Sequence, residues 1–294
     1  MEQGMTQQRN VVGVTGMRVM AVYGHPDDEG QVTGTLGAFI AAGNEVTLVC
    51  ATRGEVGEIS DPALSTPETL WYTRELELRA AMAQIGVRDV RFLGFRDSGM
   101  VGTPENEDPR ALHQQPPHVG IPAVLSIMRE VRPQIVFTWQ PDGGYGHPDH
   151  IAIHMHTVAA FEACNDASAY PEAGEPWAPS RLYWGARTMR RMAEVCFEME
   201  RRGLLPEPMN EDIRARMTAA LEAPEAPASV VIDTRDLIAA KRRSSSMHRS
   251  QFGENSMWAR VPDDLQAQVY GEERFWQARP EWREGDAAHS DFNY

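Results

Sequence analysis

Two short stretches of the sequence carry the residue types that bind metal ions and move protons. The first runs from Gly24 to Glu29 and reads GHPDDE, and the second runs from Tyr145 to His150 and reads YGHPDH. Each combines histidine with carboxylates, which are common zinc ligands and common general bases. Together they predict a catalytic metal site, provided that the fold brings the two stretches together.

Three residues from these stretches form a plausible ligand set. His25 and Asp28 are three residues apart, so at the start of a helix they occupy neighbouring positions of one face. His150 would supply a third ligand from the second stretch. Two histidine nitrogens and one carboxylate oxygen commonly hold catalytic zinc and leave one position open for water. The sequence therefore predicts Zn2+, with Fe2+ as the alternative because ferrous iron accepts the same ligands.

The remaining polar residues of the two stretches have predicted roles around that metal. Zinc-bound water has a pKa of about 7 in such sites, and Asp27 is predicted to take its proton as general base. His147 is predicted to stabilise the oxyanion or to protonate the leaving amine, and Tyr145 to polarise the carbonyl. Asp149 is predicted to orient a histidine ring from behind the metal ligands.

Each of these assignments has a structural alternative. A histidine and an aspartate three residues apart often occur by chance, and an aspartate at a helix start is commonly only a cap. His154 could be a fourth ligand or a packed helix histidine. His248 and Gln251 could close the site from the C-terminal part of the chain, or could have no function.

Three further residues could bind substrate. Arg74 could contact a substrate hydroxyl or carboxylate, or it could pair with Glu77 on its own helix. Asp97 and Ser98 follow the end of a predicted strand, where they could contact the ligand or only shape a turn. We predict all three as substrate-binding residues.

Both stretches are predicted to follow buried strands. Apolar residues 18–23 and 134–140 predict strands immediately before them, and residues 32–42 and 149–164 predict helices after them. In an open α/β sheet, ligands bind in the crevice at the carboxyl ends of the strands. This setting makes the metal interpretation more plausible than either motif does alone.

The rest of the chain extends this α/β pattern. Further strands are predicted at 45–52, 89–95, 181–186 and 230–233, and further helices at 65–85, 121–131, 188–202, 211–221 and 237–251. Residues 101–119 are predicted as a long surface loop over the site, and residues 257–294 as a Trp-rich polar end. We predict an α/β fold with a mostly parallel sheet, helices on both faces and a C-terminal α+β elaboration. The predicted organisation is a tail over 1–16, a catalytic core over 17–165, and an elaboration of the same domain over 166–294.

Composition restricts the class of partner. The chain has 294 residues and a formal net charge of −14, which argues against nucleic acid because phosphate binding needs clustered Lys and Arg. The run 241–243, Lys-Arg-Arg, is predicted to be a solvated helix face. We see no secretory signal and no apolar run of the roughly 20 residues that a membrane helix needs. We expect a cytoplasmic protein with a small-molecule substrate and make no prediction of its oligomeric state.

A dinucleotide cofactor is not expected. The turn after the first strand lacks the G-x-G-x-x-G pattern and carries Asp27, Asp28 and Glu29 where a pyrophosphate would lie. Three carboxylates would repel that group. A non-catalytic sugar- or metal-binding module is the alternative from another class, and it would be expected to have lost one of the ionisable residues.

The two stretches resemble the paired motifs of the PIG-L/LmbE-like zinc N-deacetylases, and residues 53–58 and 95–99 resemble segments of the mycothiol-pathway members. The resemblance is clear over about residues 18–164. It implies a Rossmann-like fold and zinc-dependent hydrolysis of an acetamide, often on an N-acetylglucosaminyl group. The implied roles agree with those given above: metal ligands His25, Asp28 and His150, and general base Asp27. It also implies an alternative activity, cleavage of the amide of a mycothiol-type thiol conjugate.

Overall fold

Strand β1 (Arg18–Tyr23) lies inside a seven-stranded sheet with the order β3-β2-β1-β4-β5-β7-β6. The computed structural model describes residues 10–186, 189–253, 256–283 and 285–294. β1 pairs in parallel with β2 (Glu45–Cys50) on one side and with β4 (Ile135–Thr138) on the other. Because β2 and β4 lie on opposite sides of β1, the carboxyl ends of β1 and β4 flank the point where the strand order reverses. The two motif stretches follow these two strands.

The other four strands extend the sheet on both sides. β3 (Asp89–Phe92) pairs in parallel with β2, and β5 (Arg181–Gly185) pairs in parallel with β4. β7 (Glu272–Arg279) is inserted antiparallel between β5 and β6 (Val230–Asp233). The predicted α/β class with a mostly parallel sheet is confirmed.

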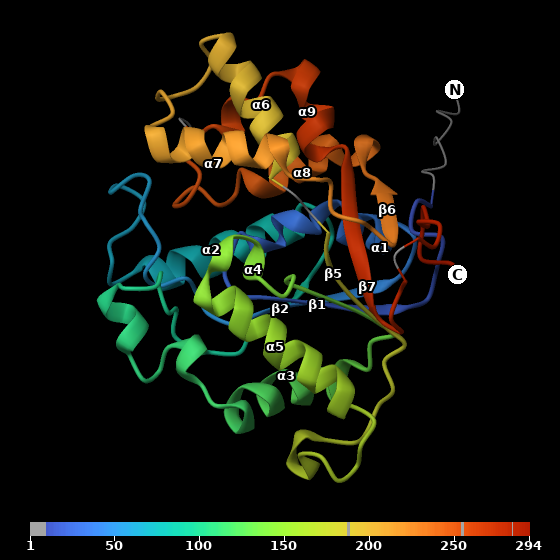
Figure 1. Ribbon diagram of the computed structural model, residues 1–294. Helices are drawn as coiled ribbons and strands as arrows, with labels where there is room; N and C mark the ends of the chain where they lie inside the picture. Colours follow the sequence, from blue (N-terminus) through green and yellow to red (C-terminus); the bar gives the residue numbers. More distant parts are fainter. Residues whose placement is uncertain (1–9, 187–188, 254–255, 284) are drawn as a thin grey trace, which may run out of the picture.

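Helices cover both faces of this sheet (Figure 1). α3 (Pro117–Val131) and α5 (Pro148–Ala163) pack together on one face, and α1 (Thr33–Ala41), α2 (Leu70–Ala83) and α8 (Ile238–Ser245) lie on the other. α6 (Arg190–Arg201), α7 (Glu211–Glu222) and α9 (Asp263–Tyr270) form a separate group beyond α8. The short helix α4 (Gly143–Gly146) lies between β4 and α5.

Several predicted element ends were wrong by a few residues. The helix predicted to begin at residue 65 begins at Leu70, and the one predicted from 121 begins at Pro117, because proline is well suited to the first helical turn. The helix predicted over 237–251 ends at Ser245. The part of residues 257–294 that the structure describes contains α9 and β7, neither of which was predicted.

β7 ties the C-terminal part of the chain to the helix that follows the first motif. Glu273 accepts hydrogen bonds from the backbone of Gly34 (2.9 Å) and Thr35 (2.7 Å), so it caps α1, whose own N-cap residue gives no side-chain cap. Lys241 Nζ lies 2.7 Å from Glu273 Oε1, and both side chains are buried. The predicted solvated face of residues 241–243 is therefore wrong for Lys241.

We expect Lys241→Met to destabilise the protein by about 3–5 kcal/mol, because it leaves the buried Glu273 carboxylate without its cation. Denaturant unfolding would measure the loss. Arg242→Met is the matched control: Arg242 is on the same helix but 3.9 Å from the exposed Asp263, so a change of about 0.5 kcal/mol or less is expected. Equal losses in the two variants would contradict the assigned role of the Lys241–Glu273 pair.

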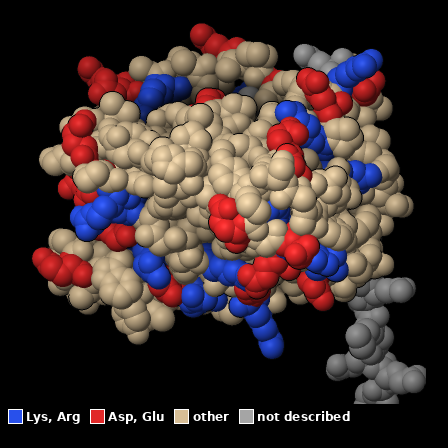
Figure 2. Space-filling view, turned by 90° about the horizontal axis from the view of Figure 1, so that it is seen from below, with Lys and Arg blue, Asp and Glu red and all other residues tan. Residues whose placement is uncertain are grey.

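The charged side chains on the surface are of both signs. On the face shown in Figure 2, acidic and basic side chains are interspersed among uncharged ones. Among the described residues, no helix is long and apolar enough to cross a membrane.

Candidate active site

The two motif stretches meet at the carboxyl ends of β1 and β4. His25 Nδ1 lies 3.1 Å from His150 Nε2, and His150 Nε2 lies 3.2 Å from Asp28 Oδ1. His25 Nδ1 is also 3.6 Å from Asp28 Oδ2. All three residues are buried. The structure therefore brings together the three residues predicted as metal ligands.

The hydrogen bonds of the two rings indicate which nitrogens carry protons. His150 Nδ1 lies 3.0 Å from the carbonyl oxygen of Gly143, and His25 Nε2 lies 3.0 Å from Asp149 Oδ2. Both of these partners are acceptors, so these ring nitrogens donate. The other nitrogen of each neutral ring then presents a lone pair, and the two lone pairs face one another.

Two lone pairs at 3.1 Å beside a carboxylate are unfavourable unless a positive charge lies among them. Burial lowers the pKa of His25, but the negative charge of Asp97 and the bonds to Asp149 outweigh it, so the pKa of His25 is raised well above its ordinary value. The carboxylates that raise this pKa favour a positive charge at this point, carried either by a second proton on His25 or by a divalent cation between the lone pairs of the neutral rings. Two groups of potential ligand atoms meet at this point in the described chain: His25, His147 and His150, and His25, Asp97 and Asp149.

Asp28 is oriented by three donors. Its Oδ2 accepts hydrogen bonds from the backbone of Gly24 (3.1 Å) and His25 (2.8 Å) and from Trp139 Nε1 (3.1 Å), which leaves Oδ1 facing His150. Burial would raise the pKa of Asp28, but the neighbouring His150 lowers it strongly, so this carboxylate is charged.

Trp139 was not singled out in the sequence. Its ring also stacks on His150, with centroids 3.9 Å apart and planes 12° apart. The only signal was its position, because it directly follows β4 and leads into the second stretch.

Asp149 and Ser98 form a buried support behind His25. Asp149 Oδ2 accepts from His25 Nε2 and from the backbone N–H of Ser98 at 2.9 Å, and Asp149 Oδ1 accepts from the hydroxyl of Ser98. Asp149 therefore contacts His25, one of the three predicted ligands. Ser98 is fully buried, so its hydroxyl orients Asp149 and does not face a ligand cavity.

His147 lies beside the two ligand histidines but uses its nitrogens differently. Its Nδ1 accepts a hydrogen bond from the backbone N–H of Asp149 at 3.1 Å, so a neutral ring carries its proton on Nε2. Burial and the neighbouring charges of His25 and His150 lower the pKa of His147 to about 4. The ring is thus a neutral N–H donor.

Tyr145 is reached through a turn that only glycine permits. Gly143 has a φ of 67°, and a Cβ there would lie 2.8 Å from the Cβ of His150. The turn places the Tyr145 ring 5.2 Å from the His150 ring, and the side chain remains largely exposed. The nearby carboxylates of Asp28 and Asp27 raise the pKa of Tyr145, so its hydroxyl keeps its proton and can donate.

Asp27 lies on the open side of the ligand set. Arg74 Nη2 donates to Asp27 Oδ2 (3.1 Å) and to the carbonyl oxygen of Pro26 (2.5 Å), and Arg74 Nη1 donates to Gly54 (2.9 Å). Burial raises the pKa of Asp27 to about 6, although Arg74 opposes this. Asp27 Oδ1 accepts no hydrogen bond from the residues that the structure describes, so it is available to another donor.

The alternative pairing of Arg74 with Glu77 is wrong, because Glu77 accepts from the backbone and hydroxyl of Ser250 (2.7 and 2.6 Å). The alternative of His154 as a fourth ligand is not supported either: its Nδ1 bonds to the carbonyl oxygen of Trp139 at 2.6 Å. Asp97 is buried, accepts from the backbone of Gly99, and lies 3.6 Å from His25 Nε2.

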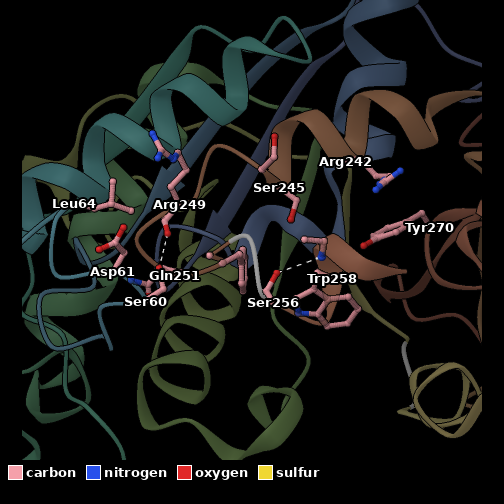
Figure 3. Close-up of a pocket in the computed structure, with 14 residues that line it drawn as sticks. Ser60, Asp61, Leu64, Arg242, Ser245, Arg249, Gln251, Ser256, Trp258 and Tyr270 are labelled. Carbon is pink, nitrogen blue, oxygen red and sulfur yellow. Dashed lines mark hydrogen bonds between the residues drawn. The ribbon is translucent and has the colours of Figure 1, made fainter. Parts of the chain in front are cut away.

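Two cavities that share part of their lining lie at the site. One, of about 290 Å³, is lined by Asp27, Asp28, Trp139, Tyr145 and His248, among others. The second, of about 840 Å³, shares Ser245, Phe252, Trp258 and Tyr270 with it. Figure 3 shows this second cavity, with Ser60, Asp61 and Leu64 on one side and Ser245, Trp258 and Tyr270 on the other. Ligand cavities in proteins commonly span roughly 300–1,000 Å³, so the space suits a molecule of more than one ring.

Comparison with known proteins gives the class of this enzyme. Residues 20–161 match the family model described as PIG-L: GlcNAc-PI de-N-acetylase. A protein of Rhodococcus erythropolis named 1D-myo-inositol 2-acetamido-2-deoxy-alpha-D-glucopyranoside deacetylase is 38% identical over 247 residues, covering 80% of this chain and 81% of that protein.

Two solved structures share the fold. The N,N'-diacetylchitobiose deacetylase of Pyrococcus horikoshii has a TM-score of 0.62 at 20% identity, covering 89% of this chain and 83% of that one. The 4-carboxy-2-hydroxymuconate hydratase GalB of Pseudomonas putida has a TM-score of 0.59 at 16% identity, covering 92% of this chain and 100% of that one. The two names describe different reactions, so the fold alone does not define the chemistry.

The named relatives define the class as a hydrolytic N-deacetylase. This chain belongs to the PIG-L family. The family predicted from the two motif stretches is thus confirmed, and the alternative of a non-catalytic binding module is rejected.

Proposed function

We propose that this protein removes the acetyl group from an N-acetylglucosaminyl compound whose other half is a cyclic polyol such as inositol. The observation that carries the proposal is the meeting of His25, Asp28 and His150 at 3.1–3.6 Å beside a free oxygen of Asp27. The naming of relatives as deacetylases of a glucosaminyl-inositol supports the substrate class.

His25, Asp28 and His150 are the proposed ligands of a divalent metal ion, Zn2+ or Fe2+. Such an ion, when bound, supplies Lewis acidity that lowers the pKa of a water to about 7 and polarises the amide carbonyl. Asp149 and Ser98 act behind it by fixing the ring of His25. Trp139 orients Asp28 through a hydrogen bond and His150 through ring stacking.

Asp27 is the proposed general base. Its free Oδ1 takes a proton from the attacking water, while Arg74 holds Oδ2. The water oxygen forms the new bond to the acetyl carbon, the C–N bond breaks, and the amine leaves with the proton that Asp27 took from the water. The products are acetate and a free amine.

His147 and Tyr145 are the proposed donors to the oxyanion. The neutral His147 ring offers Nε2–H beside the two proposed ligand histidines. The centre of its ring lies 4.6 Å from the centre of the His25 ring. Tyr145 offers a phenol that stays protonated. Hydrogen bonds aimed at a developing oxyanion contribute about 10²–10³-fold in rate each.

Arg74 and Asp97 were predicted to bind substrate, and we now propose that both act mainly on other residues of the site. Arg74 is only 3% exposed and is bonded to the turn that carries Asp27. Asp97 is 4% exposed and adds negative charge beside His25. The substrate surface is instead provided by residues that line the two cavities.

Amine release from a panel of substrates tests the proposal. The panel contains N-acetylglucosaminyl-inositol, N-acetylglucosamine, diacetylchitobiose and the amide of a mycothiol-type conjugate, with metal content measured on the same sample. Turnover that is highest on the inositol compound supports the proposal. Turnover on the conjugate alone would replace it with the amidase alternative, and no amine release from any amide would reject it.

The larger cavity gives a separate prediction for substrate length. Arg249→Ala is expected to raise KM for the inositol compound by about 3–10-fold, the scale of one lost hydrogen bond, because Arg249 lines the larger cavity and not the smaller one. KM for N-acetylglucosamine should stay within about twofold, since one ring needs only the smaller cavity. Equal effects on both substrates would show that the second cavity does not hold the polyol.

A further inference from the structure

The backbone of Asp27 has an unusual conformation. Its φ is 104° and its ψ is −21°, a region that residues with a Cβ rarely adopt. Such a conformation persists only where the surrounding structure imposes it, and it is found mainly at functional sites. Some group in the protein must therefore hold Asp27 in place.

Glu29 makes the most direct contact of this kind. Its Oε2 accepts a hydrogen bond from the backbone N–H of Asp27 at 2.8 Å. Glu29 is buried, and its carboxylate is hydrogen-bonded to the turn that runs from His25 to Asp28. The carboxylate thus fixes the backbone of Asp27, while Arg74 fixes one oxygen of its side chain.

The second oxygen of Glu29 is held by a residue 219 positions away in the sequence. His248 Nε2 lies 2.6 Å from Glu29 Oε1, and His248 is 1% exposed. Among the described residues, neither Glu29 Oε1 nor His248 Nε2 has another hydrogen-bond partner, and a buried carboxylate oxygen needs a donor just as a buried imidazole N–H needs an acceptor. His248 thus contacts the carboxylate of Glu29, and the same carboxylate contacts the backbone of Asp27.

His248 is the first residue of the segment 248–251, which follows α8 and is hydrogen-bonded to other parts of the chain. Ser250 donates to Glu77 on α2 (2.6 Å), the amide of Gln251 donates to the carbonyl of Glu58 (2.9 Å), and Ser60 donates its backbone N–H to Ser250 (2.8 Å). The segment is therefore anchored at several points, independently of Glu29.

We propose that Glu29 and His248 are positioning residues that hold Asp27 in its left-handed conformation, so that its free oxygen faces the attacking water. This proposal rests on the proposed function, because it takes Asp27 as the base. Nothing in the resemblance or in the named relatives assigns a role to either residue. Because His248 also lines the smaller cavity, direct contact with substrate is the main competing explanation.

Kinetics of four variants separate these explanations. His248→Leu removes the donor to Glu29, and we expect kcat for the acetamide to fall by about 10²-fold, the scale of a misplacement of about 1 Å. KM should stay within about twofold, and metal content should be unchanged. Glu29→Leu should have the same effect. His248→Gln, whose amide N–H can take the place of Nε2–H, should restore most of kcat.

Ser250→Ala is the matched control. It removes the bond from the Ser250 hydroxyl to Glu77 but leaves the backbone bond to Glu77 and the contact of His248 with Glu29. It should lower the unfolding midpoint while kcat per folded molecule stays within about twofold, which a general loosening of the segment would not allow.

Three results would overturn the proposal. An unchanged kcat in His248→Leu would show that Asp27 needs no such support. A raised KM with unchanged kcat would assign His248 to substrate binding. Loss of the metal would show that His248 acts on the proposed ligand Asp28 and not on Asp27. A crystal structure of His248→Leu gives a second readout: φ of Asp27 should leave the left-handed region. This readout remains decisive even if no amide substrate is found, which would reject only the proposed function.

Discussion

Asp27→Asn is expected to lower kcat for amide hydrolysis by about 10²–10⁴-fold, the range found when a general base is removed. The amide has nearly the same shape as the carboxylate and can still accept the hydrogen bond from Arg74 Nη2. It cannot accept a proton from water at neutral pH. Initial rates of amine release at saturating substrate would measure the loss.

The control for this prediction is the metal. Asp27 is not among the three proposed ligands, and the contacts of His25, Asp28 and His150 do not involve its side chain. Metal stoichiometry of Asp27→Asn should therefore equal that of the unchanged protein. If the variant loses its metal, Asp27 is a ligand, and another residue must be the base.

His150→Ala is expected to abolish both metal binding and turnover. His150 Nε2 is the atom that lies close to both other ligands, at 3.1 Å from His25 Nδ1 and 3.2 Å from Asp28 Oδ1. Its ring is held from the opposite side by Gly143 and stacked on Trp139, so its removal leaves His25 and Asp28 without the ligand that lies between them. Metal content after dialysis, and activity before and after a chelator, would measure the effect.

His154→Ala is the comparison for that variant. His154 follows His150 by one helical turn on α5 but bonds to the backbone of Trp139. It should retain the metal at full stoichiometry. If His154→Ala loses the metal and His150→Ala keeps it, the ligand set given above is wrong.

The first half of the fold could be predicted because its signals are local. Each parallel strand is a short apolar run followed by polar residues, and each helix has its own apolar face and end signals. β1 and β6 have the predicted bounds, and β2 and β4 differ only at their ends. Both motif stretches could be placed at strand ends for the same reason.

β7 could not be predicted, because its inward positions are polar. Glu273, Phe275 and Gln277 alternate toward the interior, and a strand with a buried Glu and Gln does not resemble a core strand. The burial becomes favourable only through partners distant in sequence: Lys241 for Glu273 and Tyr183 for Gln277. Such partners cannot be read from a local pattern.

The residues of the site likewise divide into those that a local sequence pattern reveals and those whose role depends on distant contacts. His25, Asp28 and His150 carry recognisable chemistry at recognisable spacing, and the structure brings them together. Trp139 and the pair of Glu29 with His248 offered no comparable signal, because their importance depends on contacts across 111 and 219 residues. Ser98 was predicted to bind substrate because it follows a strand end, but its hydroxyl is buried against Asp149.

The insertion of β7 between β5 and β6 has a consequence for the order in which the enzyme becomes active. As the chain leaves the ribosome, residues 18–164 emerge first and contain every proposed metal ligand and the base. The carboxylate that caps α1 and the histidine that holds Glu29 emerge more than 80 residues later. Contacts between distant segments form late in folding because closing a long loop costs entropy. The nascent chain can thus carry the proposed ligands before His248 has reached Glu29, and we expect Asp27 to take up its proposed position only after the segment that follows α8 has packed in place.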